Sequence, residues 1–163
     1  MILFPEFELI GKVTTSWNEV DNVWHQIYLQ LMADTPQEKA NAIFKIFVTG
    51  QAQRDLVMKV AGVSLSGHTD TLRELGRLQA KTNDVSSHRN SVVHGRIGIS
   101  LNDGGSEVTV IRGDNLGKPN RLSGKPLQPE LLRIIQEISD LLSALWSFIR
   151  KLKGIAFAER ERE

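Results

Sequence analysis

The chain has 163 residues, of which 40% are hydrophobic and 24% charged, the composition of an ordinary globular domain with one core. It contains no cysteine, so disulfides, thiolate nucleophiles and cysteine-based metal sites are excluded, and a cytoplasmic location is expected. The formal net charge is +1, so any contact with nucleic acid has to come from a local basic patch. No apolar run approaches the roughly 20 residues of a membrane-spanning helix, and the first residues lack the regions of a signal peptide, so no membrane association is expected.

The first helix is expected to start near Ser16, because Ser16 and Glu19 have the spacing of a capping box. Apolar residues then recur at helical spacing and form one face, namely Val20, Val23, Trp24, Ile27 and Leu31. The preceding segment, residues 4–13, is apolar but less regular. It either extends this helix or lies across the bundle.

The second helix has the clearest start signal in the chain. Thr35 is a good N-cap, Pro36 fits the first helical position, and Glu38 completes a capping box. We expect the helix to continue to Gly62, with Gly50 in its interior at a modest cost in helix propensity, for close packing.

The third helix is predicted from about Thr69 to His94, with Gly95 at the usual C-cap position. After this helix the spacing of apolar residues changes from helical to strand-like. Apolar and polar residues alternate over residues 97–101 and again over residues 108–111. Strong turn residues at 102–105 join the two runs, which predicts a β-hairpin over about 97–111 that leans on the helices.

A loop rich in Gly, Pro and Asn follows over about 113–128, and the last helix is predicted to open at Pro129. Its apolar stripe is so wide that the helix is either central in the bundle or shared with a second subunit. Residues 158–163 form a charged, solvated tail. The whole chain, residues 1–163, is therefore predicted to be a single all-α domain, an antiparallel four-helix bundle with a small β-hairpin before the last helix.

Three polar residues near the end of the third helix are the candidates for a functional site. Arg89 falls in the middle of the helix's apolar stripe, where an arginine is costly unless it is paired or faces a wet cleft. Asn90 and His94 are four residues apart and lie on one face beside that stripe. The arginine is long enough to reach them, so a permanent cation, an amide and an imidazole can gather along one helix edge.

These residue types suit transesterification of RNA. The planar fork of Arg89 can bind two phosphate oxygens and stabilise charge in a phosphorane-like transition state. His94 lies where exposed helix carbonyls favour a protonated imidazole, and it would move protons between the ribose 2′-hydroxyl and the leaving oxygen. No metal is required, no histidines have zinc-site spacing, and no cofactor is expected.

The segment from Arg89 to His94 resembles the hallmark of the HEPN superfamily (higher eukaryotes and prokaryotes nucleotide-binding domains). That hallmark is Arg, then Asn, Asp or His, then three residues, then His, late in a helix of a helical bundle. The resemblance implies a homodimer that brings two motifs into one cleft. Active members are metal-independent endoribonucleases, often toxins or defence factors with an antitoxin or other regulatory partner, and other members only bind RNA, nucleotides or proteins.

Other basic residues are weaker RNA-binding candidates, because solubility is the more usual role of such residues: His88, Arg96, Lys118, Arg121 and Lys125. Three hypotheses remain open. The chain is a HEPN-like ribonuclease, a non-catalytic HEPN-like module that binds RNA, a nucleotide or a protein partner, or an unrelated helical structural protein in which Arg89 and His94 serve packing.

Overall fold

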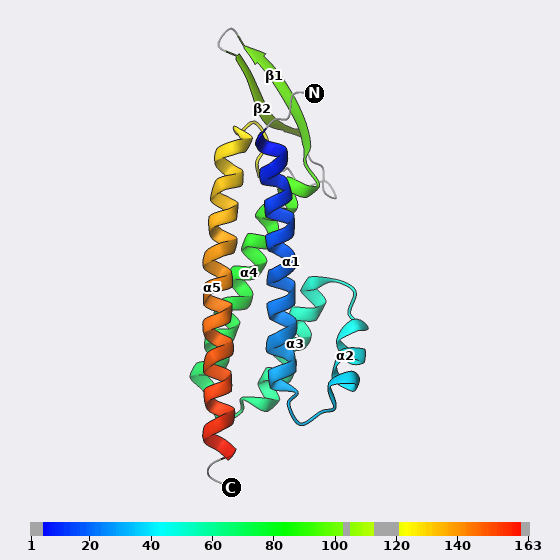
Figure 1. Ribbon diagram of the computed structural model, residues 1–163, viewed down its shortest axis with the longest axis vertical. Helices are drawn as coiled ribbons and strands as arrows, with labels where there is room; N and C mark the ends of the chain where they lie inside the picture. The colour runs from blue at the N-terminus through cyan, green and yellow to red at the C-terminus, as the bar shows by residue number, and fades with distance from the viewer. Residues whose placement is uncertain (1–4, 103–104, 113–120, 161–163) are drawn as a thin grey trace. The chain divides into compact units, whose positions relative to one another are not determined.

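The computed structural model describes residues 5–102, 105–112 and 121–160, and of residues 96–102, 105–112 and 157–160 it describes only the backbone. Within this part the fold is all-α apart from one hairpin. Its elements are α1 (Pro5–Leu31), α2 (Gln37–Lys45), α3 (Gly50–Ser64), α4 (Thr69–Val93), β1 (Arg96–Asn102), β2 (Gly105–Arg112) and α5 (Leu127–Arg160) (Figure 1). None of the described helices has an apolar stretch long enough to cross a bilayer.

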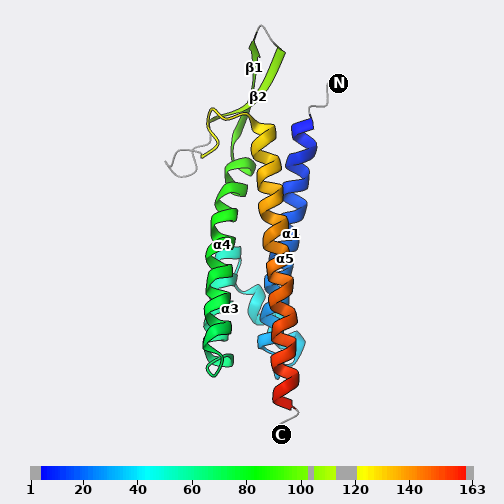
Figure 2. The ribbon, with the colours of Figure 1, turned by 90° about the vertical axis from the view of Figure 1, so that its left-hand side faces the viewer.

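The chain forms two compact units, and α1, α4 and α5 each contribute one segment to both. The first unit comprises residues 1–18 and 84–140, and the second comprises residues 19–83 and 141–163. In the first unit, the start of α1, the end of α4 and the start of α5 lie side by side (Figures 1 and 2). Its buried apolar residues are Val13, Trp17, Val85, Val92, Leu122, Leu127, Leu131, Ile134 and Ile138.

Helix α1 starts at Pro5, so the apolar segment before Ser16 extends the helix and the expected start near Ser16 is wrong. Proline suits the first turn of a helix because it has no N–H to leave unpaired. Val13 and Trp17 are buried and continue the apolar stripe of the later turns toward the N-terminus. Burial of this stripe outweighs the local capping signal at Ser16.

The predicted second helix is two helices, α2 and α3, and the prediction of a continuous helix to Gly62 is wrong. Thr49 has an extended backbone, with φ −106° and ψ 142°, and its hydroxyl accepts a hydrogen bond from the Ala52 N–H at 3.2 Å. It therefore caps α3, and Gly50 is the first residue of that helix. Pro36 is the N-cap of α2 and provides no side-chain cap, so Thr35 does not cap this helix as predicted.

In the second unit, α2 packs on the end of α1. The rings of Tyr28 and Phe44 lie 5.0 Å apart, and His25 Nε2 lies 2.8 Å from Asn41 Oδ1. The wide apolar stripe of α5 also packs into the core of this unit, where Leu141, Leu145 and Phe148 are fully buried. The wide stripe is therefore covered within the chain, as expected for a central helix.

Helix α4 has the bounds expected of it, within one residue. The segment after it forms two antiparallel strands, with Ile97 opposite Val110 and Asn102 opposite Gly105. Helix α5 begins two residues before the expected Pro129, because Leu127 is buried and belongs to the core. It continues to Arg160, into the segment predicted as a charged tail.

A buried hydrogen-bond chain crosses the second unit from α1 to α4. Trp24 Nε1 donates to Thr82 Oγ1 at 3.1 Å, and the Thr82 hydroxyl donates to the Leu78 carbonyl at 2.7 Å. Thr82 is fully buried, so its loss would leave the indole N–H unpaired away from water.

Thr82→Val keeps the shape of this side chain and removes its hydroxyl. We expect it to lower the free energy of unfolding by about 1–2 kcal/mol, the cost of one unsatisfied buried donor. Urea denaturation measures the change. Thr15→Val is the matched control, because the Thr15 hydroxyl also bonds within its own helix but is exposed, so a change below about 0.5 kcal/mol is expected. An equal loss in both variants would contradict the argument.

Candidate functional site

The last turns of α4 bring Arg89 and Asn90 into direct contact. Arg89 Nη1 donates a hydrogen bond to Asn90 Oδ1 at 3.0 Å, and both side chains are half-buried. A guanidinium held by a neighbouring amide has fewer rotamers to lose when it binds an anion, so this contact orients Arg89.

Arg89 lies on the apolar side of α4. Val85, four residues before it, and Val92, three residues after it, are both buried, and Arg89 itself is half-buried. An arginine on such a face can pack its apolar stem against the neighbouring side chains while its charged end extends toward water.

The hydrogen bonds of Arg89 are incomplete. Its Nε is buried and has no hydrogen-bond partner, and no carboxylate among the described side chains pairs with its charge. A half-buried cation without a counterion favours the binding of an anion, and the guanidinium fork matches two oxygens of a phosphate or carboxylate.

His94 is the first residue after α4 and is exposed. Its backbone N–H donates to the Asn90 carbonyl at 3.0 Å, so the helical hydrogen bonds continue to this residue and fix where its side chain leaves the backbone. Among the described residues, its imidazole makes no hydrogen bond to Arg89 or Asn90. The three predicted residues thus share the end of one helix, with two of them in contact and the third open to solvent.

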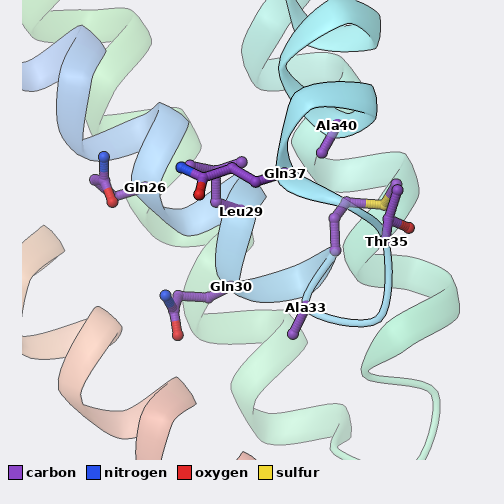
Figure 3. A pocket seen from close by; sticks show the side chains of 8 residues that line it. Gln26, Leu29, Gln30, Ala33, Thr35, Gln37 and Ala40 are labelled. Atoms are coloured by element: carbon purple, nitrogen blue, oxygen red, sulfur yellow. The ribbon is translucent and has the colours of Figure 1, made fainter.

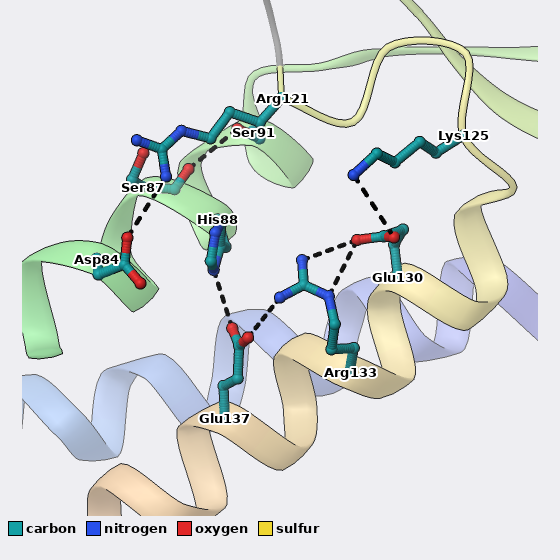
Figure 4. A network of polar contacts seen from close by, with 9 residues as sticks. All are labelled: Asp84, Ser87, His88, Ser91, Arg121, Lys125, Glu130, Arg133 and Glu137. Carbon is teal, nitrogen blue, oxygen red and sulfur yellow. Dashed lines mark hydrogen bonds and ion pairs between the residues drawn. The ribbon is translucent and has the colours of Figure 1, made fainter.

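A second polar network occupies the first unit between α4 and α5 (Figure 4). His88 Nδ1 lies 2.9 Å from Glu137 Oε2, and the other oxygen of that carboxylate accepts a hydrogen bond from Arg133. Arg133 also donates to Glu130 Oε2 from Nε at 3.1 Å and from Nη2 at 2.8 Å. Hydrogen bonding to Glu130, supported by the charge of Glu137, raises the pKa of Arg133.

The loop before α5 makes two further ion pairs, of which the first joins this network and the second contacts α4. Lys125 Nζ lies 3.8 Å from Glu130 Oε1, and Arg121 Nη1 donates to Asp84 Oδ1 at 3.4 Å. His88, Arg121 and Lys125 therefore each face a carboxylate of the same chain. This carboxylate weakens the attraction of each basic side chain for the phosphates of RNA. The side chain of Arg96 and the whole of Lys118 lie outside the described part of the chain.

Sequence reasoning missed the part of this network that lies on α5. Glu130, Arg133 and Glu137 follow one another at spacings of three and four residues, which places them on one face of a helix. That spacing is visible in the sequence, but the partner on α4 is not, because His88 and Glu137 are 49 residues apart.

Comparisons with protein-family models, with curated proteins and with solved structures found no match to this chain. Within the described residues, no three histidine or carboxylate side chains gather closely enough to hold a metal ion. The chemistry of Arg89, Asn90 and His94 is therefore the basis on which a function is proposed.

Proposed function

We propose that this chain is a HEPN-like, RNA-directed protein that cleaves RNA without a metal ion, as an endoribonuclease of the toxin or defence type. One observation carries the proposal. The half-buried guanidinium of Arg89 is held by Asn90, lacks a carboxylate partner among the described side chains, and lies just over one helical turn before the exposed His94.

The proposed reaction assigns one role to each residue. The ribose 2′-oxygen attacks the adjacent phosphorus, the bond from phosphorus to the 5′-oxygen breaks, and a 2′,3′-cyclic phosphate remains. Arg89 binds the non-bridging oxygens and stabilises their added negative charge. Asn90 orients Arg89, and His94 either accepts the 2′-hydroxyl proton or donates a proton to the leaving 5′-oxygen.

The proposal includes a homodimer. In-line displacement needs a base on one side of the phosphorus and an acid on the other, and one copy of the chain offers a single His94. A second copy supplies the second imidazole if the two motifs face one cleft. Val93, next to His94, is 38% exposed and gives the partner an apolar contact beside the motif.

A non-catalytic module that binds RNA, a nucleotide or a regulatory protein is the second candidate. It is favoured by the lack of a hydrogen bond between His94 and the Arg89–Asn90 pair, because Arg89 alone suffices to hold an anion. The Arg89–Asn90 bond lies within one chain, which is also what a purely structural role of Arg89 would produce.

RNA cleavage by the purified full chain in EDTA separates these candidates. We expect the wild type to leave 2′,3′-cyclic phosphate ends and His94→Ala to lose about 100-fold or more in rate, the usual size of a general acid–base contribution. His68→Ala is the matched control, because it removes a histidine far from the motif in sequence. If the wild type binds RNA but does not cut it, the binding module is the better assignment. If it does neither, the proposal fails.

A further inference from the structure

A hollow of about 280 Å³ lies in the second unit, where α1 ends and α2 begins (Figure 3). Gln26 and Gln30 line it from α1, and Gln37 lines it as the first residue of α2. Their carboxamides lie on one side of the turn between the helices, and Thr35 lies on the other.

The lining of this hollow is polar but uncharged. It holds three carboxamides and one hydroxyl, and none of the described residues that line it carries a charge. Within the described chain, none of the three carboxamides has a hydrogen-bond partner for its side chain. Each carboxamide offers two donors and one acceptor oxygen, so together they can satisfy a ligand that carries both donors and acceptors on its edges.

The size of the hollow and its apolar side chains further restrict the kind of ligand that fits it. Sites for drug-sized ligands have volumes of roughly 300–1,000 Å³, so this hollow fits a smaller group such as one heterocyclic ring system. Leu29 and Met32 contribute apolar surface, which suits the faces of a flat ring. Glutamine is one of the side chains that pair with adenine in bidentate fashion, because its oxygen accepts from N6 while its nitrogen donates to N7.

We propose that this hollow binds one uncharged nucleobase, and adenine in preference to the pyrimidines, through the carboxamides of Gln26, Gln30 and Gln37. The ligand is recognised by its base and not by phosphate, because no cation lines the hollow. This inference stands apart from RNA cleavage, since its residues belong to the second unit and Arg89, Asn90 and His94 belong to the first.

Titration of the full chain with adenosine, followed by protein NMR, tests the proposal. We expect saturable binding with a dissociation constant of about 0.1–1 mM, in keeping with the efficiency of small ligands. The constant should stay the same between about 50 and 300 mM salt, because no phosphate contact is made. Binding should also persist in Arg89→Ala, whatever that variant does to RNA cleavage.

Gln26→Met and Gln30→Met remove the amides at nearly constant volume and should each weaken adenosine binding about tenfold or more. Gln51→Met is the control, because Gln51 is an exposed residue of α3 that does not line the hollow. Three results would overturn the proposal: no saturable binding of adenosine at about 10 mM, equal binding by the glutamine variants and the wild type, or tighter binding of cytidine or uridine than of adenosine.

Discussion

Replacing Arg89 by alanine is expected to reduce the rate of RNA cleavage by about 100- to 1,000-fold, the loss typical of one oxyanion-stabilising donor. The guanidinium is held by the side-chain oxygen of Asn90 and has no carboxylate partner among the described side chains, so its charge is available to a phosphate. The loss should appear mainly in kcat, because the added charge on phosphorus-bound oxygens exists only in the transition state.

The variant Arg89→Lys tests whether cleavage needs only the positive charge of Arg89 or also the planar shape of its guanidinium. Lysine keeps the charge but has no planar fork and cannot reproduce a two-point contact, so this variant should recover only a small part of the activity. Arg77→Ala, which removes an exposed arginine from the same helix, should retain wild-type cleavage. Circular dichroism must show both Arg89 variants folded. Full activity in Arg89→Ala would remove this residue from the mechanism.

Arg54→Ala is expected to cause the largest loss of stability, about 3 kcal/mol in the free energy of unfolding. Arg54 is 3% exposed and joins three helices of the second unit. Its Nε donates to Asn83 Oδ1 of α4 at 3.1 Å, and its Nη1 lies 3.9 Å from Asp21 Oδ1 of α1. Truncation leaves a cavity and removes the contact of Arg54 with each of these two side chains. Burial also lowers the pKa of Arg54, against the opposing effect of Asp21 and Asp55.

For a chain of this length, a loss of about 3 kcal/mol corresponds to a melting temperature lower by about 6–12 °C. Arg54→Met fills most of the volume and should cost clearly less than Arg54→Ala, because the cavity term is removed and only the loss of the polar contacts to Asn83 and Asp21 remains. Arg150→Ala, at an exposed position of α5, should change stability by less than about 0.5 kcal/mol. A loss in Arg54→Ala no larger than in this control would show that the buried network contributes little.

The features that the sequence predicted correctly depend on neighbours along the chain. The bounds of α4 follow from one long run of helical spacing that ends at Gly95. The proximity of Arg89 and Asn90 at the end of that helix follows from their adjacency, since a helix has a known geometry. The alternation of residues 97–101 and 108–111 likewise corresponds to the two strands that the structure describes.

The features that the sequence predicted wrongly were settled by contacts between distant segments. The capping signal at Ser16 is local, and burial of Val13 and Trp17 in the core outweighed it. At the start of α2 the N-cap is Pro36 and no side chain caps the helix. At Gly50 a close approach was predicted, but its cause was not visible. A Cβ at that position would lie 3.0 Å from Arg54 Nη1 and 3.3 Å from Asp21 Oδ1, atoms that only the fold brings there.

The sequence by itself thus determined the helical class, the position of α4 and the residues of the candidate site, because each is encoded within a few turns of one helix. The tertiary structure alone decided which charges are compensated. Glu137 faces His88 and Asp84 faces Arg121, while Arg89 has no carboxylate partner among the described side chains. Ion pairing depends on separations of a few ångströms between segments tens of residues apart, and residue spacing along a chain does not specify those separations.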